Sequence, residues 1–119
     1  MGKSVGVIIT LLFAASTAFA AGAGDAAKGK DIYGKSCVGC HGPAGKGDGP
    51  AASALNPKPT NLADKAAMSK LDDAALTNVI AKGGASVGKS PIMPPFNTQL
   101  KDQDIKDVIA YIKTFSAPK

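Results

Sequence analysis

One pentapeptide, Cys37-Val38-Gly39-Cys40-His41, constrains this chain more than any other stretch, because it contains both cysteines and the single histidine of the 119 residues. Its spacing, C-x-x-C-H, is the signature of covalent c-type haem attachment. Two thiols three positions apart lie on one side of a helical turn, where they can add to the two vinyl groups of one porphyrin edge. The adjacent imidazole suits iron as an axial ligand, provided that its other ring nitrogen is hydrogen-bonded. The motif therefore predicts one covalent haem c, attached through Cys37 and Cys40 and ligated by His41.

Three other uses of these residues are weighed against haem attachment. A structural zinc site needs four nitrogen or sulfur ligands, whereas the chain offers three. A thioredoxin-like redox pair belongs to a strand-turn-helix unit, and no β-rich run precedes Cys37. A disulfide between Cys37 and Cys40 would close a very short loop and would gain little chain entropy. Haem attachment explains the motif best.

A proline-rich segment late in the chain provides a candidate for the second axial ligand. Met93 lies in the run Ser90-Pro91-Ile92-Met93-Pro94-Pro95, where three prolines make the backbone stiff and extended. Such a segment suits the presentation of a thioether at a fixed depth better than the filling of a core, which is a common use of methionine. The competitor, Met68, has no comparable proline bracing. Met93 is therefore the predicted distal ligand.

Several features in order along the chain carry a family resemblance: the C-x-x-C-H motif, the glycine-rich run after it, Met93-Pro94-Pro95 and the final Asp107-Val108-Ile109-Ala110-Tyr111-Ile112. Over about residues 25–116 the chain resembles a small bacterial class I cytochrome c. The resemblance implies an all-α fold, the class I cytochrome c fold, with three to four helices wrapped around one covalent haem. It further implies that the N- and C-terminal helices cross.

The same resemblance implies roles for other residues. Gly29 and Tyr33 match a small residue and an aromatic that pack against the last helix in this family. A backbone carbonyl near Pro57 or Pro59 is implied as the acceptor of a hydrogen bond from His41 Nδ1, and Leu62 is implied to pack on the haem. The methionine ligand of the family stands in a Met-Pro context before the last helix, as Met93 does.

Apolar spacing and capping residues predict three helices and no strand, so the fold class is all-α. Asp25 is an N-cap for a helix over residues 26–36, and a helix over residues 102–115 carries an apolar stripe. Between them, the pattern Ser69-Lys70-Leu71-Asp72 predicts a helix over residues 70–82, which Gly83 ends in the left-handed conformation. Four glycines and four prolines between residues 42 and 59 exclude a regular element there.

The N-terminal 20 residues have the features of a cleaved signal peptide. Lys3 precedes an apolar run, which is too short to span a bilayer, and Ala18-Phe19-Ala20 forms an A-x-A cleavage site. An uncleaved anchor is the alternative. We expect a signal peptide over residues 1–20, a flexible tail over residues 21–24 and a cytochrome c domain over residues 25–119. The predicted location is the periplasm, because the resemblance implies haem attachment on the far side of the bacterial membrane.

The charge pattern restricts the partners. Without residues 1–20 the chain carries 13 lysines and 9 aspartates, with neither arginine nor glutamate. Nucleic-acid binding calls for a clustered basic face with arginines or stacking aromatics, and neither is evident, so we expect no nucleic acid partner. The scattered lysines can simply form a solvated surface. In the alternative hypothesis, Lys35, Lys46 and Lys89 surround an exposed haem edge and steer an acidic redox partner.

Ligation by His41 and Met93 has a functional consequence. With both axial positions filled, the iron has no open site for a substrate, and the thioether favours the ferrous state. We therefore expect a one-electron carrier and not an enzyme. It would be a monomer that docks transiently with redox protein partners, such as a membrane electron-transfer complex, a reductase or an oxidase, without stable membrane insertion. Two alternatives stay open: a gas-sensing or peroxidase protein with a labile Met93, and a cytochrome subunit of a larger oxidoreductase.

Overall fold

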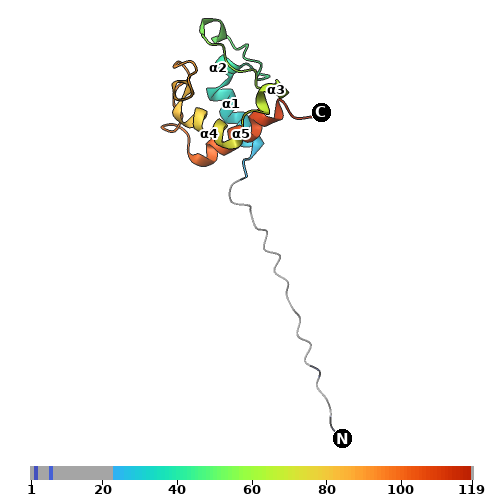
Figure 1. Ribbon diagram of the computed structural model, residues 1–119. Coiled ribbons are helices and arrows are strands. Elements are labelled where there is room, and N and C mark those ends of the chain that lie inside the picture. Colours follow the sequence, from blue (N-terminus) through green and yellow to red (C-terminus); the bar gives the residue numbers. More distant parts are fainter. Residues whose placement is uncertain (1, 3–5, 7–22, 119) are drawn as a thin grey trace.

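Three helices of ten or more residues dominate the computed structural model, which describes residues 2, 6 and 23–118 (Figure 1). They are α1 (Ala26–Ser36), α4 (Asp73–Lys82) and α5 (Asp102–Thr114). The single turns α2 (Val38–His41) and α3 (Lys65–Met68) and the 3₁₀ helices η1 (Ala52–Ala54) and η2 (Gly84–Val87) lie between them. No strand occurs in the described part of the chain, and the all-α prediction is confirmed. Apart from Gly2 and Gly6, the predicted signal peptide lies outside the described residues.

The predicted bounds of the first helix are confirmed, and the C-x-x-C-H motif is held in place by the end of this helix. The Asp25 carboxylate accepts hydrogen bonds from the backbone N–H groups of Ala27 and Lys28, at 2.9 and 3.3 Å, and so caps α1. At the other end, the N–H of Cys37 donates to the Tyr33 carbonyl at 2.9 Å. Because α2 begins one residue later, the motif forms the next helical turn after α1.

α1 and α5 lie against each other at Gly29 (Figure 1). A Cβ atom at Gly29 would overlap the backbone carbonyl of Asp107 and would stand 3.0 Å from the Cβ of Tyr111. One turn further along α1, the Tyr33 ring packs edge-on against Tyr111 and Phe115, with ring centroids 5.4 and 5.2 Å apart. The expectation that Gly29 and Tyr33 pack against the last helix is confirmed.

Asp107 fixes α5 against the start of α1. This side chain is only 2% exposed, and its Oδ1 accepts hydrogen bonds from the backbone N–H of Asp25 at 2.8 Å and from Gln103 Nε2 at 3.0 Å. These two hydrogen bonds lower the pKa of the Asp107 carboxyl below its ordinary value, and the bond from Asp25 has the larger effect. Gln103 Nε2 also donates to the Ala23 carbonyl at 3.2 Å. Ala23, which we expected to lie in a flexible tail, is therefore held against α5.

The middle of the chain departs from the sequence prediction. The predicted start at Lys70 is wrong, because α4 begins at Asp73 with Asp72 as its N-cap, whose carboxylate accepts from the Ala75 N–H at 2.7 Å. Ser69 follows α3 instead, and its hydroxyl donates to the Ala66 carbonyl at 2.8 Å. A carboxylate at Asp72 is an equally good cap three residues after Ser69, so the capping pattern alone did not settle the boundary.

The unpredicted helix α3 has its own aspartate cap. The carboxylate of Asp64 accepts from the N–H groups of Ala66 and Ala67, at 2.8 and 3.2 Å. At the end of α4, Gly83 has the predicted positive φ, 85°, but its ψ of 169° is extended and not left-handed helical. The chain therefore leaves α4 in an extended direction that glycine alone adopts readily.

The core gathers the apolar faces of the helices, and α5 contributes the predicted stripe Ile105, Val108, Ile109 and Ile112. The other buried members are Tyr33, Leu62, Met68, Leu76, Ile80 and Phe96. Within the described residues, the structure contains no helix of the length and apolarity that crossing a membrane requires.

The contact at Gly29 predicts opposite effects of alanine at two glycines of α1. Gly29→Ala should lower the free energy of unfolding by about 1–3 kcal/mol, because its methyl group must displace the backbone of α5. Gly34→Ala should raise it by about 0.5–1 kcal/mol, because a Cβ there meets nothing within 4 Å. Urea denaturation of both variants measures these changes, and equal effects at the two positions would contradict the close contact.

The position of Asp107 predicts a pH-dependent contribution to stability. Its folded-state pKa is lowered, so the stabilisation is present above the unfolded carboxyl pKa of about 3.9 and is lost as the pH falls through the folded value. Asp107→Asn should therefore be less stable than wild type at neutral pH, and the difference should shrink below about pH 4. Denaturation across this range tests it. Asp31→Asn, at an exposed position of α1, controls for the change in net charge.

Candidate haem site

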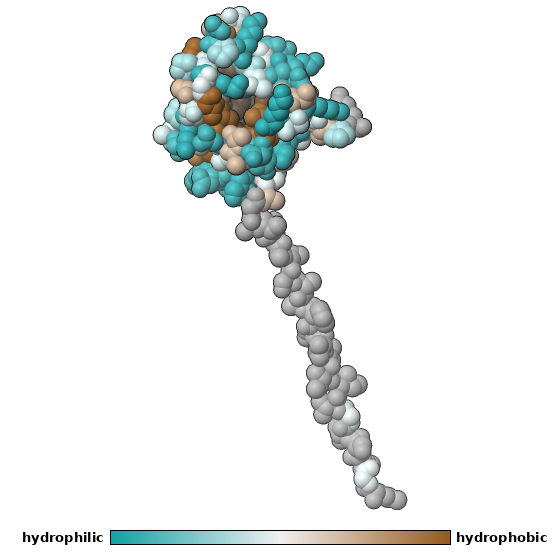
Figure 2. All heavy atoms as spheres, in the orientation of Figure 1, coloured by the Kyte–Doolittle hydropathy of each residue, from teal (hydrophilic) through white to brown (hydrophobic). Residues whose placement is uncertain are grey.

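A cavity of about 430 Å³ lies between the helices and the two long loops. Its walls are mostly apolar, and its size falls within the range of about 300–1,000 Å³ that is usual for cofactor sites. Figure 2 shows its mouth as a hollow edged by hydrophobic side chains on a largely hydrophilic face. The apolar lining includes Leu55, Leu62, Leu71, Leu76, Val79, Ile80, Phe96, Leu100, Val108 and Ile112.

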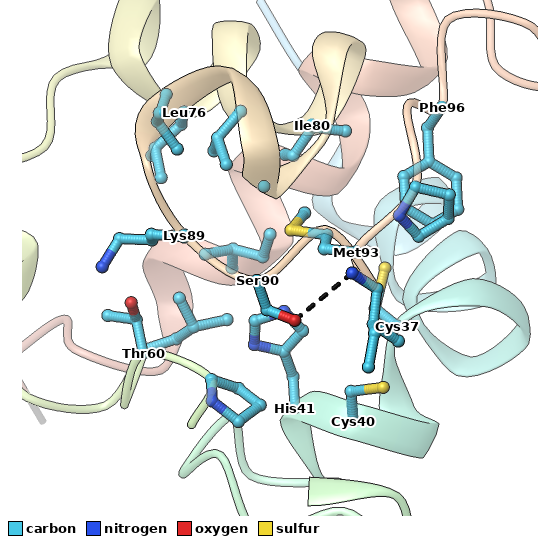
Figure 3. A pocket seen from close by; sticks show the side chains of 18 of the residues that line it. Cys37, Cys40, His41, Thr60, Leu76, Ile80, Lys89, Ser90, Met93 and Phe96 are labelled. Atoms are coloured by element: carbon cyan, nitrogen blue, oxygen red, sulfur yellow. Dashed lines mark hydrogen bonds between the residues drawn. The ribbon is translucent and has the colours of Figure 1, made fainter. Parts of the chain in front are cut away.

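All four predicted site residues, Cys37, Cys40, His41 and Met93, line this one cavity. Figure 3 shows the imidazole of His41 and the thioether of Met93 entering from opposite sides, with the two cysteine sulfurs together at one flank. Both cysteines are free thiols. The structure thus brings together two segments that are more than 50 residues apart in the sequence.

The glycine-rich loop after the motif folds back and holds the α2 turn. The backbone carbonyls of this turn accept hydrogen bonds from loop N–H groups: Gly39 from Ala51 at 2.9 Å, Cys40 from Gly49 at 3.1 Å and His41 from Gly47 at 2.8 Å. These carbonyls have no partner within so short a helix, and the loop supplies one for each. A Cβ at Gly49 would overlap the backbone of Gly39, so this position of the loop requires glycine.

Tyr33 fixes the residue that follows His41. Its hydroxyl is buried and donates to the Gly42 carbonyl at 2.6 Å. Burial raises the pKa of the Tyr33 phenol well above its ordinary value, so the hydroxyl keeps the proton that it donates. The backbone of Gly42 has a φ of 79°, where the chain turns out of α2. Tyr33 therefore links the α1–α5 contact to the orientation of the motif.

The His41 imidazole is partly buried, and its Nδ1 is a buried polar atom without a hydrogen-bond partner of good geometry. No hydrogen bond of good geometry joins Nδ1 to Pro57 or Pro59, and the backbone group that interacts with the ring belongs to Thr60, next to Pro59. Burial lowers the pKa of His41. The backbone interaction with Thr60 partly offsets this effect. The ring is thus favoured in the neutral form, which is the form that binds a metal ion.

The Cys37 thiol is favoured in its protonated form. Burial, and next the adjacent Cys40, raises the pKa of Cys37 to about 11. A metal-binding cysteine is a thiolate, and it lies where positive charge lowers its pKa. Among the described residues there is also no group of three or more His, Cys, Asp or Glu side chains able to hold a metal ion.

The Met93 segment is fixed by the end of α4. The N–H of Gly84 donates to the Met93 carbonyl at 3.0 Å, and beyond Met93 the N–H of Phe96 donates to the Ile80 carbonyl at 2.9 Å. Met68, the competing methionine, is 8% exposed and belongs to the core, not to the cavity lining. Of these two methionines, only Met93 lies where a ligand to a group in the cavity must be.

These observations fit a haem. The cavity offers apolar walls to a macrocycle, two thiols at one side, and a nitrogen and a sulfur donor that face each other (Figure 3). The unpartnered Nδ1 of His41 leaves the imidazole able to take up the hydrogen bond that orients a ligating histidine.

The lysines around the mouth differ from those that we expected. Lys89 lines the cavity, but Lys35 and Lys46 do not, and Lys58, which the sequence analysis missed, does. The mouth also carries Ile92, which is 60% exposed and is one of two exposed large hydrophobic residues of the described region. Closeness to the motif in the sequence was a poor guide, because Lys35 is exposed on α1 outside the cavity lining.

Comparisons with known proteins point the same way. The family model described as "Cytochrome c" matches residues 26–116. Cytochrome c-554(547) of Halothiobacillus neapolitanus is 35% identical over 94 residues, which cover 77% of this chain and 98% of that protein. Cytochrome c6 of Synechocystis is 33% identical over 91 residues, which cover 76% and 65%.

Two further likenesses are more restricted. The cbb3-type cytochrome c oxidase subunit FixP of Bradyrhizobium diazoefficiens is 35% identical over 95 residues, which cover 80% of this chain but only 29% of that subunit. Among solved structures, the KustC0563 c-type cytochrome superposes with a TM-score of 0.60 over 75% of this chain and 98% of the other, at 23% identity. This structural likeness concerns the fold.

Proposed function

The chain belongs to the cytochrome c family, and on this premise we propose that it carries single electrons between redox proteins in the periplasm, after removal of a signal peptide over residues 1–20. The family implies covalently bound haem c. In the proposal, the domain over residues 25–119 binds one such haem through Cys37 and Cys40, with His41 and Met93 as axial ligands. The observation that carries the proposal is that these four residues line one apolar cavity.

The roles of the residues follow from their chemistry. A haem bound here supplies an iron that gains or loses one electron. His41 contributes a neutral imidazole at the end of a rigid helical turn, and Met93 contributes a soft thioether that favours the ferrous state. If His41 and Met93 both bound the iron, no coordination position would be left for a substrate, so we infer that the chain is a carrier and not an enzyme.

The surface around the cavity mouth supports a transient encounter with a redox partner. Exposed Ile92 and Val87 offer a small apolar contact beside the cavity, and Lys58 and Lys89 add positive charge. Lysines at the rim of a contact act mainly on the association rate and on its salt dependence. We propose that an acidic redox protein docks here, with the chain itself a monomer.

Ligation by Met93 is tested by the far-red spectrum of the ferric holoprotein, where iron-bound thioether gives a weak charge-transfer band. Wild type should have this band, and Met93→Ala should lose it and bind carbon monoxide in the ferrous form. Met68→Leu is the matched control, because it replaces a core methionine at nearly constant volume and should keep the band. A high-spin wild-type spectrum without the band would contradict the proposal and favour gas-sensing or peroxidase chemistry.

A second candidate is a cytochrome subunit of a larger oxidoreductase, which the similarity to FixP favours. The two candidates differ in the strength of association. A free carrier should separate from solubilised membranes as salt is raised, since exposed charges are screened, whereas a subunit should stay with its complex. Size-exclusion chromatography of the native protein at low and high salt, followed by haem absorbance, distinguishes them. Retention in a large complex at high salt would exclude the free carrier.

A further inference from the structure

We propose that Gly84 and Ser90 are positioning residues for Met93, which set the depth at which its thioether enters the cavity. This inference rests on the proposed ligation by His41 and Met93. Both residues line the cavity beside Met93, and neither carries an atom suited to binding the iron. Their effect is therefore exerted through the backbone of the segment from Lys89 to Met93.

Gly84 is bonded to both ends of this segment. Its N–H donates to the Met93 carbonyl at 3.0 Å, and its carbonyl accepts from the Lys89 N–H at 2.9 Å. A Cβ at Gly84 would overlap the Ser90 carbonyl and would stand 3.3 Å from the Met93 Cβ. The absence of a side chain at this position thus lets the segment lie directly on the start of η2.

The requirement at Gly84 is one of space and not of backbone conformation. Gly83, the preceding residue, has a φ of 85°, which is unfavourable for any other residue, but the φ of Gly84 lies outside this region. Alanine can adopt the backbone conformation of Gly84. A methyl group there acts by displacing the segment that carries Met93, which makes this substitution a clean probe of the contact.

Ser90 closes the turn that presents Met93. Its side chain is 9% exposed, and its Oγ accepts a hydrogen bond from the Ile92 N–H at 3.3 Å, the dashed line of Figure 3. Its carbonyl accepts from the Met93 N–H at 3.3 Å. These are two bonds within four residues, and together they fix the direction in which the backbone delivers the Met93 side chain.

The segment also lies close against Gly83, where a Cβ atom would stand 2.9 Å from the Met93 carbonyl oxygen, but its own side chains are mostly exposed. Pro91, Pro94 and Pro95 are exposed, and Ile92 is 60% exposed. The prolines stiffen the backbone but donate no hydrogen bonds. Because the prolines stiffen the segment, we expect a displacement at Gly84 or Ser90 to shift the Met93 thioether as well.

The test compares Gly84→Ala and Ser90→Ala with wild type and with Gly34→Ala, a control in which the added methyl meets nothing within 4 Å. The holoproteins are matched by haem content and by helix content. We expect Gly84→Ala to lose most of the far-red band of the ferric form and to bind carbon monoxide when reduced. Ser90→Ala should show a smaller change in the same direction, and Gly34→Ala should behave as wild type.

The outcomes separate this inference from the proposed function. If wild type has the band and both variants keep it in full and remain inert to carbon monoxide, the positioning role is wrong while the ligation stands. If wild type itself lacks the band, the ligation is wrong and the inference fails with it. Should Gly84→Ala yield no holoprotein, Ser90→Ala decides, because it removes one hydroxyl and adds no bulk; an unchanged band then overturns the positioning role.

Discussion

The approach of two backbones at Gly29 is the constraint on which the rest of the structure depends. It joins α1, which runs directly into the C-x-x-C-H turn, to α5, which supplies Val108 and Ile112 to the cavity wall. Asp107 fixes the register of this contact, because its carbonyl faces Gly29 while its carboxylate accepts the N–H of Asp25. Any change in the separation of the two helices would move the motif relative to the wall.

The loop that follows His41 and the segment that follows Met93 are both attached to the carboxyl ends of helices. A helix leaves its last carbonyls without partners, and here loop N–H groups supply them. The loop after His41 donates to the carbonyls of α2, and the segment after Met93 donates to those of Ile80 and Ala81 at the end of α4. These hydrogen bonds hold each loop in one conformation, although both loops are rich in glycine and proline and have few buried side chains.

The sequence predicted the parts of the fold in which a local signal agrees with the tertiary structure. Asp25 and the apolar stripe of the last helix gave α1 and α5 to within a residue or so. The start of α4 was missed because Ser69 and Asp72 are competing caps, and packing decides between them. The burial of Asp107 was not predictable, since an aspartate inside a helix normally faces water, and here the chain before α1 covers it. The C-x-x-C-H spacing named three candidate site residues and the proline-rich context of Met93 the fourth, but the lysines at the mouth depend on directions that only the structure gives.

The two sides of the cavity are held unequally, and this asymmetry bears on function. On the His41 side, three consecutive carbonyls and the Tyr33 hydroxyl fix a turn that also contains both cysteines. On the Met93 side, a largely exposed segment depends on a few backbone bonds to the end of α4 and the start of η2. On the proposed ligation, loss of these bonds would free the thioether before it disturbed the imidazole. Displacement of the Met93 side chain alone, with the helices unchanged, would then convert an electron carrier into a protein whose iron can bind a small ligand.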